Sequence, residues 1–256
     1  MLLLKKPFHI LGLFASVLLT GCGAILVNEG SKEEPLTDGL KNPAAMQAKV
    51  NVPADQKIVG NFDDGSTSIN SKLYGAGGGV WSVFAGGGNT VNNPYVVAGG
   101  AKGTAMAAHL FGTLVNKGDN TYPSFTLQGK LKQSGYYDAS AFSGIRFYYK
   151  SPSEDKAPAQ RFKFTIAATL PTSNGGTCAD GCYNHFGADL STAADWELKS
   201  YSFSDLKRGS GWGSAVIPPD LVDHLKEVVG LEWSHDSGNT AGSFPIDYWV
   251  DEVEFF

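Results

Sequence analysis

The stretch that decides the fold is residues 145–150, which read Ile145-Arg146-Phe147-Tyr148-Tyr149-Lys150. Ile145, Phe147 and Tyr149 occupy the odd positions, and more polar or amphipathic side chains occupy the even ones. Successive side chains of a β-strand point to opposite faces, so this period of two predicts a strand with one buried face. The first element read from the chain is therefore a half-buried strand.

The same alternation recurs along the chain. It is found at residues 125–131, where Gly129 interrupts it, and at 161–166, and further strands are expected at 105–110, 196–203, 228–233 and 248–255. Clusters of glycine, asparagine and serine separate these segments and predict turns. Residues 219–224 are the one place that favours a helical turn or two. Several short strands between turn signals predict an all-β sandwich or barrel.

The composition agrees with an all-β secreted domain. The 256 residues include 32 glycines and 30 aromatic residues (15 Phe, 10 Tyr and 5 Trp), and only 18% are charged. The formal net charge is −5, and no basic stripe is present. Nucleic acid is therefore excluded as an expected partner.

The N-terminus reads as an export signal. Lys5 and Lys6 precede an apolar stretch, Phe8–Leu19, of signal-peptide length, and the segment closes on Leu19-Thr20-Gly21-Cys22. This ending resembles the lipobox of bacterial lipoproteins. The resemblance implies a signal peptide at 1–21 and a Cys22 that carries diacylglycerol and an N-acyl chain such as palmitate. The alternative is an ordinary secretory signal that happens to contain a cysteine.

A lipidated Cys22 would place the protein at the cell envelope, facing the periplasm or the exterior. Two acyl attachments give stable anchoring where one chain is marginal. The protein is expected to contact the membrane through this lipid alone. Gly23 follows the cysteine, and in Gram-negative lipoproteins this would permit sorting to the outer membrane. Residues 22–57 hold no aromatic residue and are expected to form a flexible tether. Residues 58–256 are expected to form one domain.

The remaining cysteines, Cys178 and Cys182, lie four positions apart in a glycine-containing run. In an oxidising compartment the simplest reading of such a pair is a disulfide that closes a short loop. A redox or zinc pair is the weaker alternative, because the spacing is not C-x-x-C and no second pair exists.

Four short motifs carry a family resemblance. They are residues 62–65 (Phe-Asp-Asp-Gly), 137–147, 205–213 and 247–253. In this order they resemble the galactose-binding-like domains of carbohydrate-binding modules, most nearly family 11. The resemblance implies a jelly-roll β-sandwich of two antiparallel sheets, a concave face that binds β-glucans, and structural calcium.

The last motif also allows an argument from its residues. Val250 and Val253 are both apolar but three positions apart, so an unbroken strand would send them to opposite faces. If both enter the core, a β-bulge must lie at Asp251-Glu252. Such a bulge turns carboxylates sideways, and Asp63 and Asp64 are expected on the first strand, which neighbours the last strand in this fold. Calcium prefers oxygen ligands, so Asp63 and Asp251 are predicted to bind it. The alternative is a solvated acidic strand end.

A sugar needs flat aromatic surfaces and hydrogen-bonding groups. Arg146 and Tyr148 share the outward side of their strand, and Tyr183 and His185 share a face beyond the predicted disulfide. If the two segments lie side by side, these residues form a binding platform. Trp212 beside a glycine-rich loop is a further candidate contact, as is Trp81. The alternative for each aromatic residue is packing in the core.

Catalytic signatures are scarce. No serine has glycine two positions before and after it, no H-E-x-x-H motif occurs, and the glycine-rich stretches lack the ending of a phosphate loop. Glu232 and Asp236 at a strand end are the carboxylates that leave a hydrolase or lyase open.

The sequence thus predicts a monomeric, non-catalytic lipoprotein that binds a β-glucan-like polysaccharide or oligosaccharide at the cell envelope. The alternatives are a jelly-roll polysaccharide hydrolase or lyase, and an envelope module that binds another protein.

Overall fold

The computed structural model describes residues 50–75, 77–119, 122–152, 160–210, 213, 217 and 220–256. The described strands are β1 (Ile58–Gly60), β2 (Gly78–Ala85), β3 (Val96–Ala98), β4 (Met106–Asn116), β5 (Ser124–Lys132), β6 (Gly144–Ser151), β7 (Gln160–Ile166), β8 (Phe186–Leu190), β9 (Ala193–Ser202), β10 (Val228–Asp236) and β11 (Gly242–Phe255). The described helices are 3₁₀ turns: η2 (Ala54–Gln56), η3 (Ala101–Gly103), η4 (Ala167–Thr169), η5 (Thr172–Asn174), η6 (Phe203–Asp205) and η7 (Leu221–Glu227). In this part of the chain, no helix has the length and apolar character that crossing a membrane requires.

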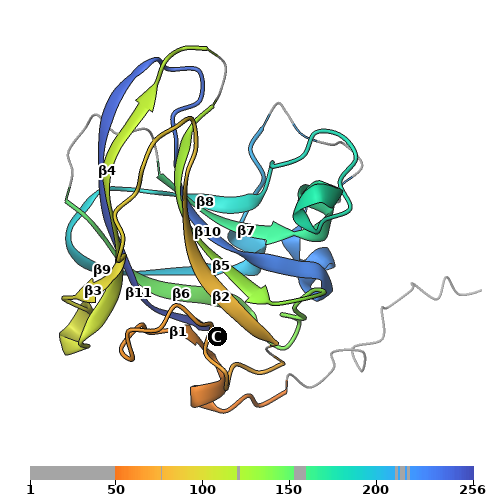
Figure 1. Ribbon diagram of the computed structural model, residues 1–256. Coiled ribbons are helices and arrows are strands. Elements are labelled where there is room, and N and C mark those ends of the chain that lie inside the picture. The colour runs from red at the N-terminus through yellow and green to blue at the C-terminus, as the bar shows by residue number, and fades with distance from the viewer. Residues whose placement is uncertain are drawn as a thin grey trace, which may run out of the picture. The chain divides into compact units, whose positions relative to one another are not determined.

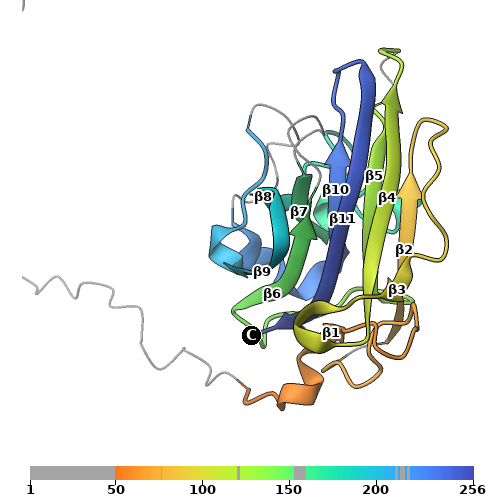
Figure 2. The same ribbon diagram turned by 90° about the vertical axis from the view of Figure 1, so that its left-hand side faces the viewer.

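The strands form two antiparallel sheets that face each other (Figures 1 and 2). The first sheet has the order β3-β4-β11-β6-β9, with β1 paired to β11, and the second has the order β2-β5-β10-β7-β8. The predicted all-β sandwich of two antiparallel sheets is confirmed. The predicted helical turn at residues 219–224 corresponds to η7 (Leu221–Glu227), but it is not the one place with such a turn, because η2 to η6 are 3₁₀ turns as well.

The alternation at 145–150 sets the inner face of β6. Ile145, Phe147 and Tyr149 are at most 1% exposed, whereas Arg146 is exposed. The segment predicted at 105–110 is part of the longer β4, which pairs with β11 from Ala108 to Asn116. This pairing also explains why β11 begins at Gly242, earlier than the apolar alternation indicates.

The centre of the core is a cluster of aromatic rings from both sheets. The ring of Trp233 in β10 lies 4.9 Å from Phe147 of the first sheet, 5.1 Å from Phe162 and 5.9 Å from Trp81. Trp81 is 3% exposed, so its alternative as core packing is correct and its prediction as a rim contact is wrong. A Cβ on Gly129 would lie 2.7 Å from the Trp81 ring, so glycine makes room for the indole.

A buried tyrosine adds a polar connection between the sheets. Tyr248 in β11 is fully buried, and its hydroxyl donates to the Trp233 carbonyl at 2.9 Å. The same oxygen accepts the Leu127 N–H at 3.0 Å. One side chain of the first sheet therefore satisfies two backbone groups of the second, and burial raises the pKa of this phenol well above its ordinary value.

The predicted bulge in β11 is confirmed. The β6–β11 register places Asp251 opposite Tyr148 and Glu254 opposite Arg146, so β11 contains one residue more than its partner between these pairs. Glu252 has φ of +49°, and Val250 and Val253 are both fully buried.

The chain near β1 differs from expectation in two ways. Asp63 and Asp64 were expected on the first strand, but β1 ends at Gly60, and Phe62, with φ of +59°, turns the chain before them. Val52 is 4% exposed in the core, so the packed part of the chain begins before Ile58.

Replacing Tyr248 by phenylalanine tests the polar connection. The variant keeps the ring but leaves the Leu127 N–H and the Trp233 carbonyl without this partner. We expect the free energy of unfolding, measured by urea denaturation, to fall by about 1–3 kcal/mol. Tyr136→Phe, at a 37% exposed position, is the control and should change little. Equal stability of the two variants would contradict the assigned role.

Candidate functional site

The strand register places polar side chains in rows on the outer face of the second sheet. Ser82 lies opposite Gln128, Gln128 opposite Glu232, and Glu232 opposite Lys163. These positions alternate with core residues, so their side chains point away from the first sheet. We call this surface the polar face, and its members are Ser82, Phe84, Thr126, Gln128, Arg161, Lys163, Thr165, Asp189, Glu232, Ser234 and Asp236.

Several side chains of the polar face are covered by neighbouring residues. Thr126, Thr165 and Ser234 are at most 7% exposed, although they point outward from the sandwich. The Lys163 side chain is only 15% exposed, and its ion-pair partner Asp236 is 44% exposed. Apart from Asp236, these groups are therefore largely desolvated before any ligand arrives.

Hydrogen bonds fix the orientation of these groups. The Gln128 amide donates to Glu232 Oε1 at 3.0 Å, and the Ser234 hydroxyl donates to Asp236 Oδ1 at 2.8 Å. Burial raises the pKa of the Glu232 carboxyl, with a further contribution from Asp236, while Lys163 and the Gln128 bond oppose the change. The face thus presents donors and acceptors in fixed positions.

His185 lies beside this network but is itself 5% exposed. Its Nδ1 is 2.7 Å from the Thr169 hydroxyl. Burial lowers its pKa from 6.5 to about 3, with a smaller contribution from Lys163 and an opposing one from Asp236. His185 is therefore neutral at physiological pH and largely inaccessible to solvent.

The disulfide loop positions an exposed tyrosine at one edge of the polar face. Cys178 and Cys182 are bonded, which confirms the predicted pair. Tyr183, the next residue, has φ of +72°, is 52% exposed, and donates its N–H to the Thr169 carbonyl at 2.7 Å. Its ring meets His185 edge-on at 6.2 Å.

A second exposed ring lies at the opposite edge of the same sheet. Phe84 in the edge strand β2 is 59% exposed and lies in register with Thr126 of β5. Tyr183 precedes β8, the other edge strand of the path. Two accessible aromatic rings therefore lie near the two edges of this sheet.

The predicted four-residue platform is not formed. Arg146 and Tyr148 lie on the outer face of the first sheet, whereas Tyr183 and His185 belong to the second. Arg146 pairs with Glu254, and the Lys102 ammonium lies 4.9 Å from the Tyr148 ring centroid. The period of two correctly gave the outward side of Arg146 and Tyr148. It was wrong for Tyr183 and His185, which lie before β8 rather than in a strand and differ in exposure, 52% against 5%. Contact of each residue with sugar remains a prediction.

Two predicted residues lie outside the described part of the chain, namely Trp212 and the lipidation site Cys22. The segment on either side of Trp212 is partly described. Asn184 donates to the Gly209 carbonyl at 2.9 Å and accepts the Gly209 N–H at 2.8 Å, and a Cβ on Gly213 would lie 2.8 Å from Asn184.

The two predicted calcium ligands meet at the same loop. Asp251 Oδ2 accepts hydrogen bonds from the Ala101 N–H and the Thr104 hydroxyl, each at 2.8 Å. Asp63 Oδ1 accepts the Ala105 N–H at 2.7 Å. Burial raises the pKa of Asp251, and the nearby Asp63 adds to that effect. Among the described residues, no three acidic, histidine or cysteine side chains gather around a common metal position.

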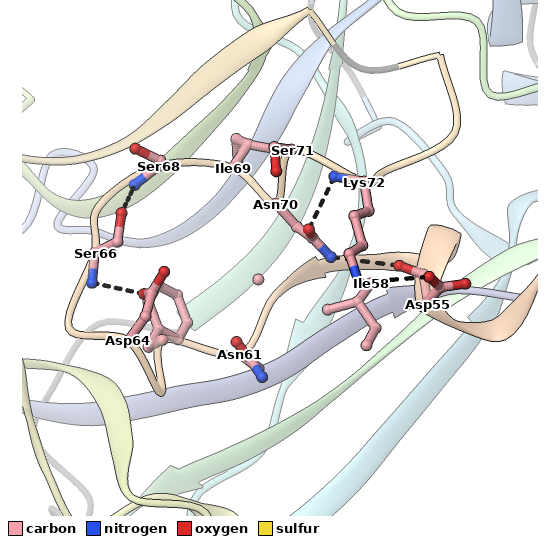
Figure 3. A pocket seen from close by; sticks show the side chains of 12 residues that line it. Asp55, Ile58, Asn61, Asp64, Ser66, Ser68, Ile69, Asn70, Ser71 and Lys72 are labelled. Atoms are coloured by element: carbon pink, nitrogen blue, oxygen red, sulfur yellow. Dashed lines mark hydrogen bonds and ion pairs between the residues drawn. The ribbon is translucent and has the colours of Figure 1, made fainter.

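A hollow of about 530 Å³ lies elsewhere, between β1 and the loop that follows it (Figure 3). Its polar groups are largely bonded within the loop itself. Asp64 accepts the Ser66 N–H at 2.8 Å, the Ser66 hydroxyl accepts the Ser68 N–H at 2.9 Å, and Asn70 accepts the Lys72 N–H at 3.0 Å. We attribute this hollow to the turns of the loop rather than to a binding site.

The carboxylates that left catalysis open are each engaged by a neighbour. Glu232 and Asp236 both lie on β10, and Glu232 Oε1 accepts the Gln128 amide at 3.0 Å. Asp236 is also engaged by Lys163.

Sequence reasoning missed Phe84, Gln128 and Lys163 as members of the site. Lys163 was visible as the polar alternate of its strand, and Gln128 occupies the corresponding position between Leu127 and Gly129. The signal that could have found them is the outward half of each alternating segment, once the strand order is known.

No family model matches the sequence, and no curated protein matches it. Among solved structures, the chain is similar to the family 11 carbohydrate-binding module of the cellulosomal cellulase Lic26A-Cel5E of Clostridium thermocellum, at 18% identity and a TM-score of 0.47, over 69% of this chain and 86% of that one. It is also similar to the CBM22-1 xylan-binding domain of Paenibacillus barcinonensis Xyn10C, at 16% identity and a TM-score of 0.39, over 78% and 94%. A third similar structure is SGBP-B from a xyloglucan utilization locus of Bacteroides uniformis, at 12% identity and a TM-score of 0.40, over 78% and 49%. These similarities are low, and they assign no ligand to this chain.

The buried His185 predicts a pH dependence of stability. Between pH 6.5 and about 3 the unfolded chain binds a proton at this residue that the folded chain does not. Stability conferred by the neutral ring is therefore present above pH 6.5 and is lost as the pH falls, by about 1.4 kcal/mol per pH unit. We expect His185→Gln to lose stability less steeply than the wild type over this range, as measured by urea denaturation. Equal slopes would contradict the burial of a neutral imidazole.

Proposed function

We propose that the sandwich is a non-catalytic carbohydrate-binding domain and that the polar face is its binding surface. The observation that carries the proposal is the fixed row Gln128–Glu232–Lys163 in a sheet with exposed rings near both edges, Phe84 in β2 and Tyr183 before β8. Rings cover the apolar faces of sugars, and oriented amide, carboxyl and ammonium groups bind hydroxyls.

The low exposure of the row favours binding. Ordering side chains and desolvating polar groups are major costs of association. Here Glu232 already accepts a bond from Gln128, and Lys163 is already held by Asp236. A ligand would therefore bind groups that folding has already oriented, and little further side-chain entropy would be lost on binding.

The charges of the polar face favour a neutral glycan. Lys163 is paired with Asp236 and Arg161 with Asp189, and the remaining carboxyl, Glu232, accepts the Gln128 amide and has its pKa raised by burial. A neutral, β-glucan-like polysaccharide is the class that the family resemblance implies. We propose further that Cys22 is lipidated and holds the domain at the cell envelope. The lipobox-like sequence and the tether after it support this location.

Affinity electrophoresis of the full chain in gels that contain β-glucan tests the binding surface. We expect the wild type to be retarded. Phe84→Ala and Tyr183→Ala should each weaken binding about 5- to 30-fold, which corresponds to about 1–2 kcal/mol for burying one ring face. Tyr136→Ala is the matched control, because this tyrosine is exposed and lies outside the polar face.

The result would overturn the proposal if both ring variants were retarded as strongly as the wild type. If no glycan retards the wild type, the domain binds another class of partner, such as protein. Release of reducing sugar from the gel polysaccharide would instead support a hydrolase.

We propose that calcium binds as a structural ion at the loop of residues 101–105, whose groups donate hydrogen bonds to both Asp63 and Asp251. The atoms available there as calcium ligands are oxygens. They include the Thr104 hydroxyl and the Ala101 carbonyl, which lie 2.6 Å apart. Repulsion between the carboxylates of Asp63, Asp251 and Glu252 also favours a cation.

Calcium removal is the corresponding test. We expect a chelator to lower the thermal midpoint of the full chain by several degrees, and added Ca²⁺ to restore it. Asp63→Asn should abolish the response to chelator. An unchanged midpoint on chelation would mean that the hydrogen bonds to Ala101, Thr104 and Ala105 hold the loop without metal.

A further inference from the structure

The outer face of the first sheet, which Figure 2 views, carries a row of four aromatic rings from three strands. Phe111 and His109 come from β4, Trp249 from β11 and Trp196 from β9. Successive ring centroids in this order lie 5.0, 3.7 and 6.2 Å apart. We call these four residues the aromatic strip.

The strip is not part of the core. Leu110 and Val250, the neighbours of its members along β4 and β11, are fully buried, so the strip residues point to the opposite side. Phe111 is 49% exposed, and Trp196, Trp249 and His109 are partly exposed. Rings at these positions contribute little to the packing between the sheets.

Contacts within the sheet hold the central rings in place. His109 stacks on Trp249 with an angle of 8° between their planes. Its Nε2 lies 2.9 Å from Asp247 Oδ1, and the Lys150 ammonium lies 5.6 Å from the Trp249 ring centroid. The result is a row of oriented rings that crosses the strands, with a carboxylate and an ammonium beside it.

This combination selects the chemical class of the ligand. The central rings are interleaved with the charged groups of Asp247 and Lys150, whereas the centre of a protein interface is depleted of charged residues. Both signs are present, so a neutral ligand is complementary. Rings for apolar faces together with polar groups for hydroxyls are the requirements of a pyranoside chain.

We propose that the aromatic strip is a second carbohydrate-binding surface, on the opposite sheet from the polar face. The ligand class rests on the proposed function, but the surface is separate from it. Since the two surfaces face away from each other, one molecule would bind two glycan chains and link them. Tyr148 lies on the same outer face, in register with Leu198 of β9 and outside the aromatic strip.

Binding stoichiometry tests the proposal. The purified full chain is titrated calorimetrically with a panel of β-glucan hexasaccharides, and we expect two bound per chain for the wild type. The double variant Phe111→Ala/Trp196→Ala should bind one. Leu198→Ala is the matched control, because this side chain is 51% exposed on the same face and has no ring. Unchanged thermal midpoints establish that the variants are folded.

The same titration separates the two proposals. Phe84→Ala/Tyr183→Ala should also bind one hexasaccharide, at the strip. If the strip variant equals the wild type, the strip does not bind glycan and this inference is wrong. If the strip variant loses all binding while Phe84→Ala/Tyr183→Ala keeps it, the strip is the binding surface and the polar face is not. Absence of binding by the wild type to every hexasaccharide would overturn both.

A second readout follows from the linking of chains. Wild-type protein mixed with a soluble β-glucan should raise light scattering as chains are joined, and the strip variant should not, although it still binds. Scattering that stays at the level of the strip variant would contradict simultaneous binding at two surfaces.

Discussion

The fold depends on the contact between the two sheets at Trp233. Its indole meets Phe147 of the first sheet, and its backbone carbonyl accepts the Tyr248 hydroxyl from that same sheet. The contact is thus apolar and polar at once, which fixes the position of β11 against β10. Everything on the outer faces follows, because a strand held in register by its inner residues has no freedom in its outer ones. The same core thus fixes the positions of both the polar face and the aromatic strip.

Much of the fold could be predicted because its signals are local. The alternation at 145–150 reports burial directly, and the spacing of Val250 and Val253 revealed the bulge that the register shows. The limits of elements were less accessible. β11 begins before its apolar pattern does, since its early residues are held by pairing with β4. Pairing of this kind involves residues distant in sequence and leaves no local mark.

The site was harder to predict for the same reason. Period-two patterns placed Arg146 and Tyr148 together, and Tyr183 near His185, but the sheet to which each segment belongs depends on strand order. The exposure of these two side chains could not be predicted from their spacing either. His185 is buried, whereas Tyr183, two positions earlier, is exposed and has a positive φ directly after the disulfide. The residue types that carbohydrate binding requires could be recognised in the sequence, but the strand order determines which of them lie close together.

The bulge at Asp251-Glu252 has a consequence for comparing this chain with others. Before it, even-numbered residues of β11 face the core, as Tyr248 and Val250 do; after it, odd-numbered residues do, as Val253 and Phe255 do. A relative that lacks the bulge would need a one-residue gap there in any alignment. Without that gap, every position toward the C-terminus would be matched to a residue of the opposite face, and true similarity would be scored as difference.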